Sequence, residues 1–112
     1  MKLELYWKKE NEEFKLGILE KEQREYTFKI NEEELKKAIK KGCMGIGNFD
    51  LLKEEYKSTS LFPFFKNRIP EKDNRKIKEI LEEYNLNEYD EMELLRATSA
   101  ELGTDNYYMK EV

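Results

Sequence analysis

The chain of 112 residues contains no histidine and a single cysteine, Cys43. Histidine is the usual general base and transition-metal ligand near neutral pH. Its absence excludes a Ser-His-Asp or Cys-His catalytic site within this chain. One cysteine also excludes an internal disulfide and a cysteine-rich zinc cluster. We therefore expect no enzymatic activity, no metal and no cofactor, and we interpret Cys43 as a structural residue.

Long apolar runs are also absent. The longest is Leu61–Phe65, five residues, whereas a membrane-spanning helix needs about 20. No positively charged, apolar signal segment follows Met1. Together with the scarcity of cysteine, this predicts a reducing, cytoplasmic location. Aromatic residues make up 12% of the chain, too many for a disordered acidic protein, and the length predicts one domain over residues 1–112.

Charge is abundant but unevenly distributed. The chain has 21 basic and 25 acidic residues, a net charge of −4. Residues 57–78 hold seven basic and two acidic residues, whereas residues 79–112 hold two basic and ten acidic residues. A basic stripe is required to displace counterions from nucleic-acid phosphates. One basic window in an acidic chain gives weak support for a nucleic-acid-binding accessory domain, which stays an alternative.

Alternation of apolar and polar residues predicts three strands, near residues 2–8, 14–20 and 24–30. Their short polar connections predict an antiparallel meander. A final short strand is indicated near residues 107–112, after a turn. The apolar members of the three strands are Leu3, Leu5, Trp7, Phe14, Leu16, Ile18, Tyr26, Phe28 and Ile30.

The later segments favour helices. Asn31 followed by Glu34 is typical of a helix start, and Gly42 of its stop, so the first helix is expected at 31–41. Helical spacing predicts two more, at 71–84 and 88–98, the last capped by Asn87. The type of element around Leu51, Leu52 and Tyr56 stays open.

These elements indicate an α+β fold. We expect a single domain in which a small antiparallel sheet, or a partly closed barrel, is covered by about three helices. Three glycines follow the first helix, at Gly42, Gly45 and Gly47. They are interpreted as turns rather than a phosphate-binding loop, because no strand precedes them and no Gly-Lys-Ser/Thr follows.

The segment from Tyr56 to Pro70 has neither helical nor strand periodicity. It places bulky apolar residues and two prolines between basic ones, a composition typical of protein interfaces. Core packing alone and core packing combined with an interface are equally compatible with the sequence. The interface hypothesis has aromatic anchors and a basic rim, and its candidate partner-binding residues are Ser58, Ser60, Leu61, Phe62, Phe64, Phe65, Asn67 and Arg68.

The same segment resembles a known family. The run Leu61–Pro70, with the later runs Leu94–Thr98 and Thr104–Asp105, is similar to the N-terminal domain of the HipA family of bacterial toxin kinases. Two aromatics, a gap, and then an apolar residue with Pro-Glu carry the likeness: Phe64, Phe65, Ile69, Pro70 and Glu71, followed by the basic Arg75. After Thr98, where many relatives have two glycines, this chain has Ser99 and Ala100.

The resemblance implies a function in regulation. In full-length HipA proteins this domain precedes the kinase, whereas the present chain stops at Val112. A free-standing version resembles HipS of tripartite HipBST toxin–antitoxin systems. That implies an antitoxin that binds and restrains a separate HipA-like (HipT-type) Ser/Thr kinase and, through the complex, a helix-turn-helix repressor. The kinase would use ATP and magnesium, and this chain would use neither. A non-catalytic interaction domain unrelated to kinase inhibition is the other alternative.

Overall fold

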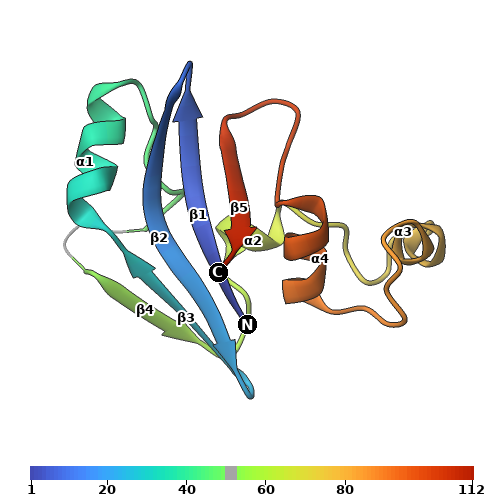
Figure 1. Ribbon diagram of the computed structural model, residues 1–112. Helices are drawn as coiled ribbons and strands as arrows, with labels where there is room; N and C mark the ends of the chain where they lie inside the picture. The colour runs from blue at the N-terminus through green and yellow to red at the C-terminus, as the bar shows by residue number, and fades with distance from the viewer. Residues whose placement is uncertain (50–52) are drawn as a thin grey trace.

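A five-stranded antiparallel sheet organises the protein (Figure 1). The computed structural model describes residues 1–49 and 53–112. The strand order is β4-β3-β2-β1-β5, so the sheet has open edges at β4 and β5 and is not closed into a barrel. The α+β prediction with a small antiparallel sheet is confirmed. The strands are β1 (Lys2–Lys9), β2 (Glu12–Glu22), β3 (Glu25–Ile30), β4 (Glu55–Ser58) and β5 (Tyr107–Glu111).

One face of the sheet forms the core, as the alternating pattern requires. Leu3, Leu5 and Trp7 of β1 point into it, as do Phe28 of β3 and Met109 of β5. The opposite face is polar. It carries an ion pair between β2 and β1, another between β5 and β2, and a stacked pair of tyrosines, Tyr6 and Tyr108. The helices that contribute buried residues therefore lie on the apolar face.

A β-bulge in β2 overturns one prediction. The register between β1 and β2 shifts so that Leu5 pairs with Gly17 but Tyr6 pairs with Lys15. The extra residue reverses the alternation in the second half of the strand. Ile18, predicted to face the core, lies half-exposed on the outer face, and Leu19 takes the fully buried position instead.

The first helix was predicted from its ends, and it is confirmed. Helix α1 spans Glu32–Lys40, and the Asn31 side chain accepts a hydrogen bond from the Glu34 N–H. Gly42 follows the helix with φ +112°, a conformation that favours glycine. Leu35 and Ala38 are buried, and α1 packs against β2.

The later helices differ in extent from those predicted. Helix α3 spans Ile77–Glu83 rather than 71–84, because the Asn74 side chain accepts the Lys76 N–H and holds a turn before it. Helix α4 spans Glu91–Thr98, and its cap is Asp90 instead of Asn87. A short helix not expected from the sequence, α2, spans Pro63–Lys66.

Strand β4 is also new, because periodicity did not determine the element type there. Tyr56 lies within it and pairs with Phe28 of β3. Leu51 and Leu52, which were considered with Tyr56, lie outside the described residues.

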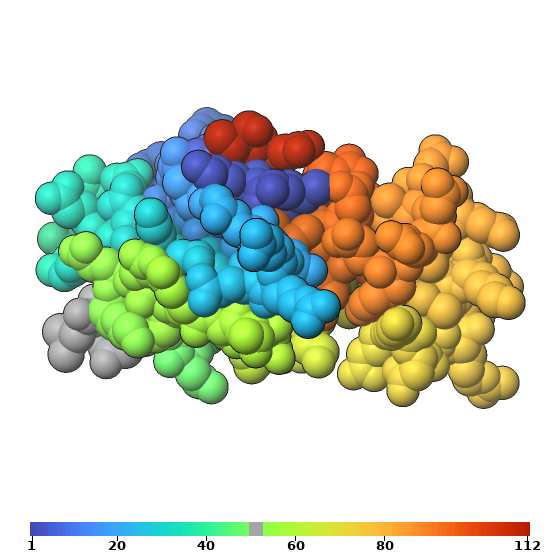
Figure 2. Space-filling model, turned by 90° about the horizontal axis from the view of Figure 1, so that it is seen from below, coloured from blue at the N-terminus to red at the C-terminus, as the bar shows by residue number. Residues whose placement is uncertain are grey.

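The molecule is longer than it is thick, with principal extents of 41 × 31 × 23 Å. Figure 2 shows α1 and the loop after it towards one end and the residues around α3 at the other. Helix α3 contributes no fully buried residue, so it is the most weakly integrated of the helices in the described part of the chain. In the described ranges 1–49 and 53–112, no helix has the length and apolar character needed to cross a membrane.

The bulge generates a stability prediction. A Cβ added at Gly17 would overlap the Lys29 carbonyl oxygen and lie 2.9 Å from two ring carbons of Phe28. Because that backbone and core ring cannot move freely, Gly17→Ala should lower the free energy of unfolding by about 1–3 kcal/mol. Urea unfolding measures this directly.

Gly103→Ala is the matched control. Apart from its chain neighbours, no described residue has a heavy atom within 4 Å of a Cβ built at Gly103, so this variant should be neutral or slightly stabilising. Equal unfolding free energies for the two variants would show that β2 is not locked against Phe28 and Lys29 as described.

Candidate functional site

The predicted partner-binding residues divide between core and surface. Four of them are buried, two are half-buried and two are exposed. The buried ones are Leu61, Phe62, Phe65 and Arg68; the half-buried ones are Ser58 and Phe64; the exposed ones are Ser60 and Asn67. The segment therefore supplies part of the core and also part of the surface.

Proline determines how the segment divides in this way. Phe62 adopts an extended conformation before Pro63, as residues preceding proline prefer, and Pro63 begins α2. Within this single helical turn, successive side chains point in different directions around the helix axis. Phe65 points inwards and is fully buried, whereas Phe64 stays partly accessible and Asn67, at the end of the turn, is exposed.

The aromatic rings form a continuous path from the core to the surface. Phe28 contacts Phe49 and Phe65, with ring centroids 4.9 and 5.0 Å apart. Phe49 then contacts Phe62 at 5.4 Å, and Phe64 contacts Phe65 at 5.2 Å. All four pairs are tilted or edge-to-face, and aromatic quadrupoles favour edge-to-face contacts. The partly exposed rings are thus held in place by buried ones.

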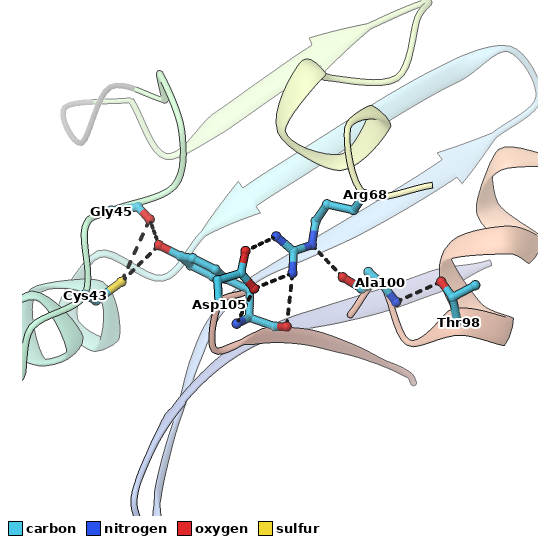
Figure 3. A network of polar contacts seen from close by, with 7 residues as sticks. Cys43, Gly45, Arg68, Thr98, Ala100 and Asp105 are labelled. Carbon is cyan, nitrogen blue, oxygen red and sulfur yellow. Dashed lines mark hydrogen bonds and ion pairs between the residues drawn. The ribbon is translucent and has the colours of Figure 1, made fainter. Parts of the chain in front are cut away.

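Arg68 corrects the prediction of a basic rim at this position. Its side chain is 3% exposed and is the buried charge of the described core. The guanidinium donates to both carboxylate oxygens of Asp105, at 2.9 and 2.8 Å (Figure 3). It also donates to the carbonyls of Ala100 and Tyr107. A glutamate at this position would break a buried ion pair rather than alter the charge of an exposed rim.

The turn after α4 presents one of these carbonyls. Ser99 and Ala100 both adopt left-handed conformations, with φ of 57° and 53°. Thr98 Oγ1 accepts the Ala100 N–H, and the Ser99 carbonyl accepts the Met109 N–H of β5. Hydrogen bonds to Thr98, Arg68 and Met109 hold this turn without a glycine.

Tyr107 joins the loop after α1 to the same network. Its hydroxyl donates to the Gly45 carbonyl and lies 3.5 Å from Cys43 Sγ. Burial and the neighbouring thiol raise the pKa of the Tyr107 phenol. The Arg68 guanidinium lies over the rings of both Phe64 and Tyr107, 5.4 and 5.5 Å from their centroids. Cys43, interpreted as structural, is buried.

A groove lies where these segments meet, which we call the aromatic groove. Its volume is about 480 Å³. Rings and other apolar groups form most of its wall, and two exposed side-chain amides border it. The lining residues are Gly47, Asn48, Phe49, Tyr56, Phe62, Pro63, Phe64, Asn67, Arg68 and Leu102.

A second cleft, of about 690 Å³, is lined largely by charged groups. It lies between the β2–β3 hairpin and the start of α4, where the Tyr26 hydroxyl donates to Glu91 at 2.8 Å. Burial and Glu91 together raise the pKa of Tyr26. Within the described residues, no group of three or more His, Cys, Asp or Glu side chains could hold a metal ion.

The buried ion pair predicts a pH dependence of stability. Arg68 lowers the pKa of the Asp105 carboxyl below its ordinary value of 3.8 by hydrogen bonding and by its charge. A carboxyl whose pKa is lower in the folded than in the unfolded state stabilises the fold fully at pH values above its unfolded-state pKa. This stabilisation is lost as the pH falls towards its folded-state pKa. Below about pH 4, the unfolding free energy of wild type should fall more steeply than that of Asp105→Asn. Glu4, whose pKa is also lowered, is present in both proteins.

Urea unfolding at a series of acid pH values measures the two slopes. Asp73→Asn, an exposed substitution before α3, is the control and should keep the wild-type slope. If the unfolding free energies of wild type and Asp105→Asn fall with the same slope at acid pH, the ion pair at Asp105 is not stabilising.

The comparisons with known proteins agree with this architecture at the level of family. Residues 11–103 match the HipA N-terminal domain. No curated protein and no solved structure was matched. The matched range includes three of the sheet's strands, all four helices of the described residues and all the residues that line the aromatic groove. The chain therefore belongs to the HipA N-terminal domain family.

Proposed function

We propose that this chain is an antitoxin-like regulatory protein that binds and restrains a separate HipA-like Ser/Thr protein kinase. The observation that carries the proposal is membership of the HipA N-terminal domain family over residues 11–103. This domain accompanies a kinase within its family. A chain of this kind acts by contact rather than by catalysis, and it uses no ATP, magnesium or other cofactor of its own.

The surface of the segment 58–68 supports a docking role. Phe64 is partly accessible beside the exposed Asn67, and Ser60 is exposed where β4 ends. Aromatic side chains contribute strongly to interfaces because they bury large areas with few rotatable bonds. Leu61, Phe62, Phe65 and Arg68 contribute from behind the surface, by fixing the shape that the exposed residues present.

Restraint of a kinase is a matter of differential affinity. A regulator inhibits when it binds the inactive conformation more tightly than the active one, and couplings of about 1–3 kcal/mol correspond to about 5- to 150-fold shifts. A preformed surface suits this role, because little binding free energy is spent on ordering its side chains.

Nucleic-acid binding has less support. Several exposed lysines are neutralised by acidic neighbours, including Lys36 by Glu32 and Lys57 by Glu55. Such pairing leaves fewer cations available to release counterions from phosphates. We include a helix-turn-helix repressor in the proposal only as a component reached through the kinase. A neighbouring reading frame for each of these proteins is the corresponding genomic expectation.

The proposal predicts inhibition in trans. The purified chain should bind the HipA-like kinase encoded beside it with a Kd in the micromolar range or tighter, and should suppress its autophosphorylation at stoichiometric concentration. Co-expression should relieve the growth arrest that the kinase causes. Calorimetry and a phosphorylation assay measure binding and inhibition separately.

An unrelated Ser/Thr kinase serves as the specificity control. The proposal is contradicted if the folded chain neither binds nor inhibits its neighbouring kinase, or if it inhibits both kinases equally.

A further inference from the structure

The aromatic groove extends the docking surface beyond the segment found in the sequence. Four separate parts of the chain build it: Gly47–Phe49, Tyr56, Phe62–Arg68 and Leu102. We propose that it receives one bulky, uncharged side chain of the partner kinase, which enters as an anchor. This inference rests on the proposed function and specifies what the partner must supply.

The chemistry of the lining selects an apolar occupant. Phe49, Phe62 and Phe64 present ring surfaces, and Leu102 is a large apolar residue that is 37% exposed. Burial of such surface is favourable in proportion to the apolar area removed from water. The amides of Asn48 and Asn67 lie at the same groove and are both exposed. They can hydrogen-bond the peptide groups on either side of an inserted side chain.

Charge complementarity argues against an ionic occupant. Among the described residues that line the groove, Arg68 is the one that is charged, and Asp105 already neutralises it through two hydrogen bonds. An acidic or basic side chain in this groove would lose hydration without gaining an unpaired counterion, which is costly. The second cleft differs in this respect, because Lys21, Lys72 and Glu71 are among its lining residues.

The size of the groove fits a single anchor. Its volume of about 480 Å³ is at the lower end of the range of about 300–1,000 Å³ for ligand sites. A site of this size accommodates one aromatic side chain together with a short flanking stretch of chain. A nucleic acid or a whole helix is too large for it.

The walls are held in place before any partner arrives. Arg68 lies over Phe64, and the Tyr107 hydroxyl holds the Gly45 carbonyl in the loop that leads to Gly47. Gly47 has φ +52°, and a Cβ there would lie 3.3 Å from Cδ1 of Phe64. The close approach of this glycine to Phe64 sets one dimension of the groove. Preorganised walls lower the entropic cost of binding.

Leu102→Glu tests the inference, and Ile39→Glu is its matched control. Both residues are large, apolar and similarly exposed, 37% and 39%, but Ile39 lies on α1 and does not line the groove. We expect Leu102→Glu to weaken kinase binding at least thirtyfold, because it places a carboxylate against the apolar wall. Ile39→Glu should change the Kd less than threefold. Both variants should keep the wild-type melting temperature, because neither residue is buried.

A photo-crosslinking residue at position 102 identifies the occupant. Mass spectrometry of the crosslink should locate a kinase peptide with a bulky uncharged side chain at the site of attachment. The inference is overturned, while the proposed function stands, if wild type and Leu102→Glu bind the kinase equally tightly. It is also overturned if the kinase side chain at the site of attachment is charged. Crosslinking to a second copy of this chain, with a dimer in sedimentation analysis, would also overturn it. Failure of wild type to bind the kinase would instead refute the proposed function.

Discussion

A buried ion pair holds together the segments beside the aromatic groove. Arg68 satisfies its donors on Asp105 and on the carbonyls of Ala100 and Tyr107, so one side chain joins the loop after α2, the turn after α4 and the start of β5. No buried side-chain polar atom among the described residues lacks a partner. Because a guanidinium left without its partners in the core is strongly destabilising, these segments are fixed relative to one another.

The groove follows from that constraint. The sheet supplies a rigid base, and the loops above it supply walls of the groove, a common division in folded domains. The buried rings of Phe28 and Phe65 contact the partly exposed rings of Phe49 and Phe64 and hold them in place. Arg68 also lies over the ring of Phe64, 5.4 Å from its centroid. A partner that binds here would therefore meet a surface that is already ordered.

Local patterns predict much of this fold, and contacts distant in sequence explain the rest. Two-residue periodicity locates β1, β2 and β3, and the Asn31 cap locates α1, because both signals depend on neighbouring residues. A bulge adds one residue and leaves no local mark, so Ile18 and Leu19 exchange faces. Strand β4 is short and depends on its pairing with β3. Periodicity could not identify it.

The site was predicted only in part for the same reason. Its aromatic segment is conspicuous in the sequence, but Asp105 lies 37 residues from Arg68 and resembles an ordinary turn residue. Phe49 and Leu102 join the groove only through the tertiary fold. No pattern within a window could have paired Arg68 with Asp105, so a basic residue beside aromatics was assigned to an exposed rim.

Hydrogen–deuterium exchange in Arg68→Lys tests most directly whether this ion pair holds the loops. Lysine keeps the charge but not the two-pronged contact. We predict faster exchange at the Ala100 and Tyr107 amides, which donate to Thr98 and Asp105, with protection in β1 and β2 unchanged because those strands do not open locally. Unchanged exchange at Ala100 and Tyr107, or equal acceleration throughout the sheet, would contradict the account.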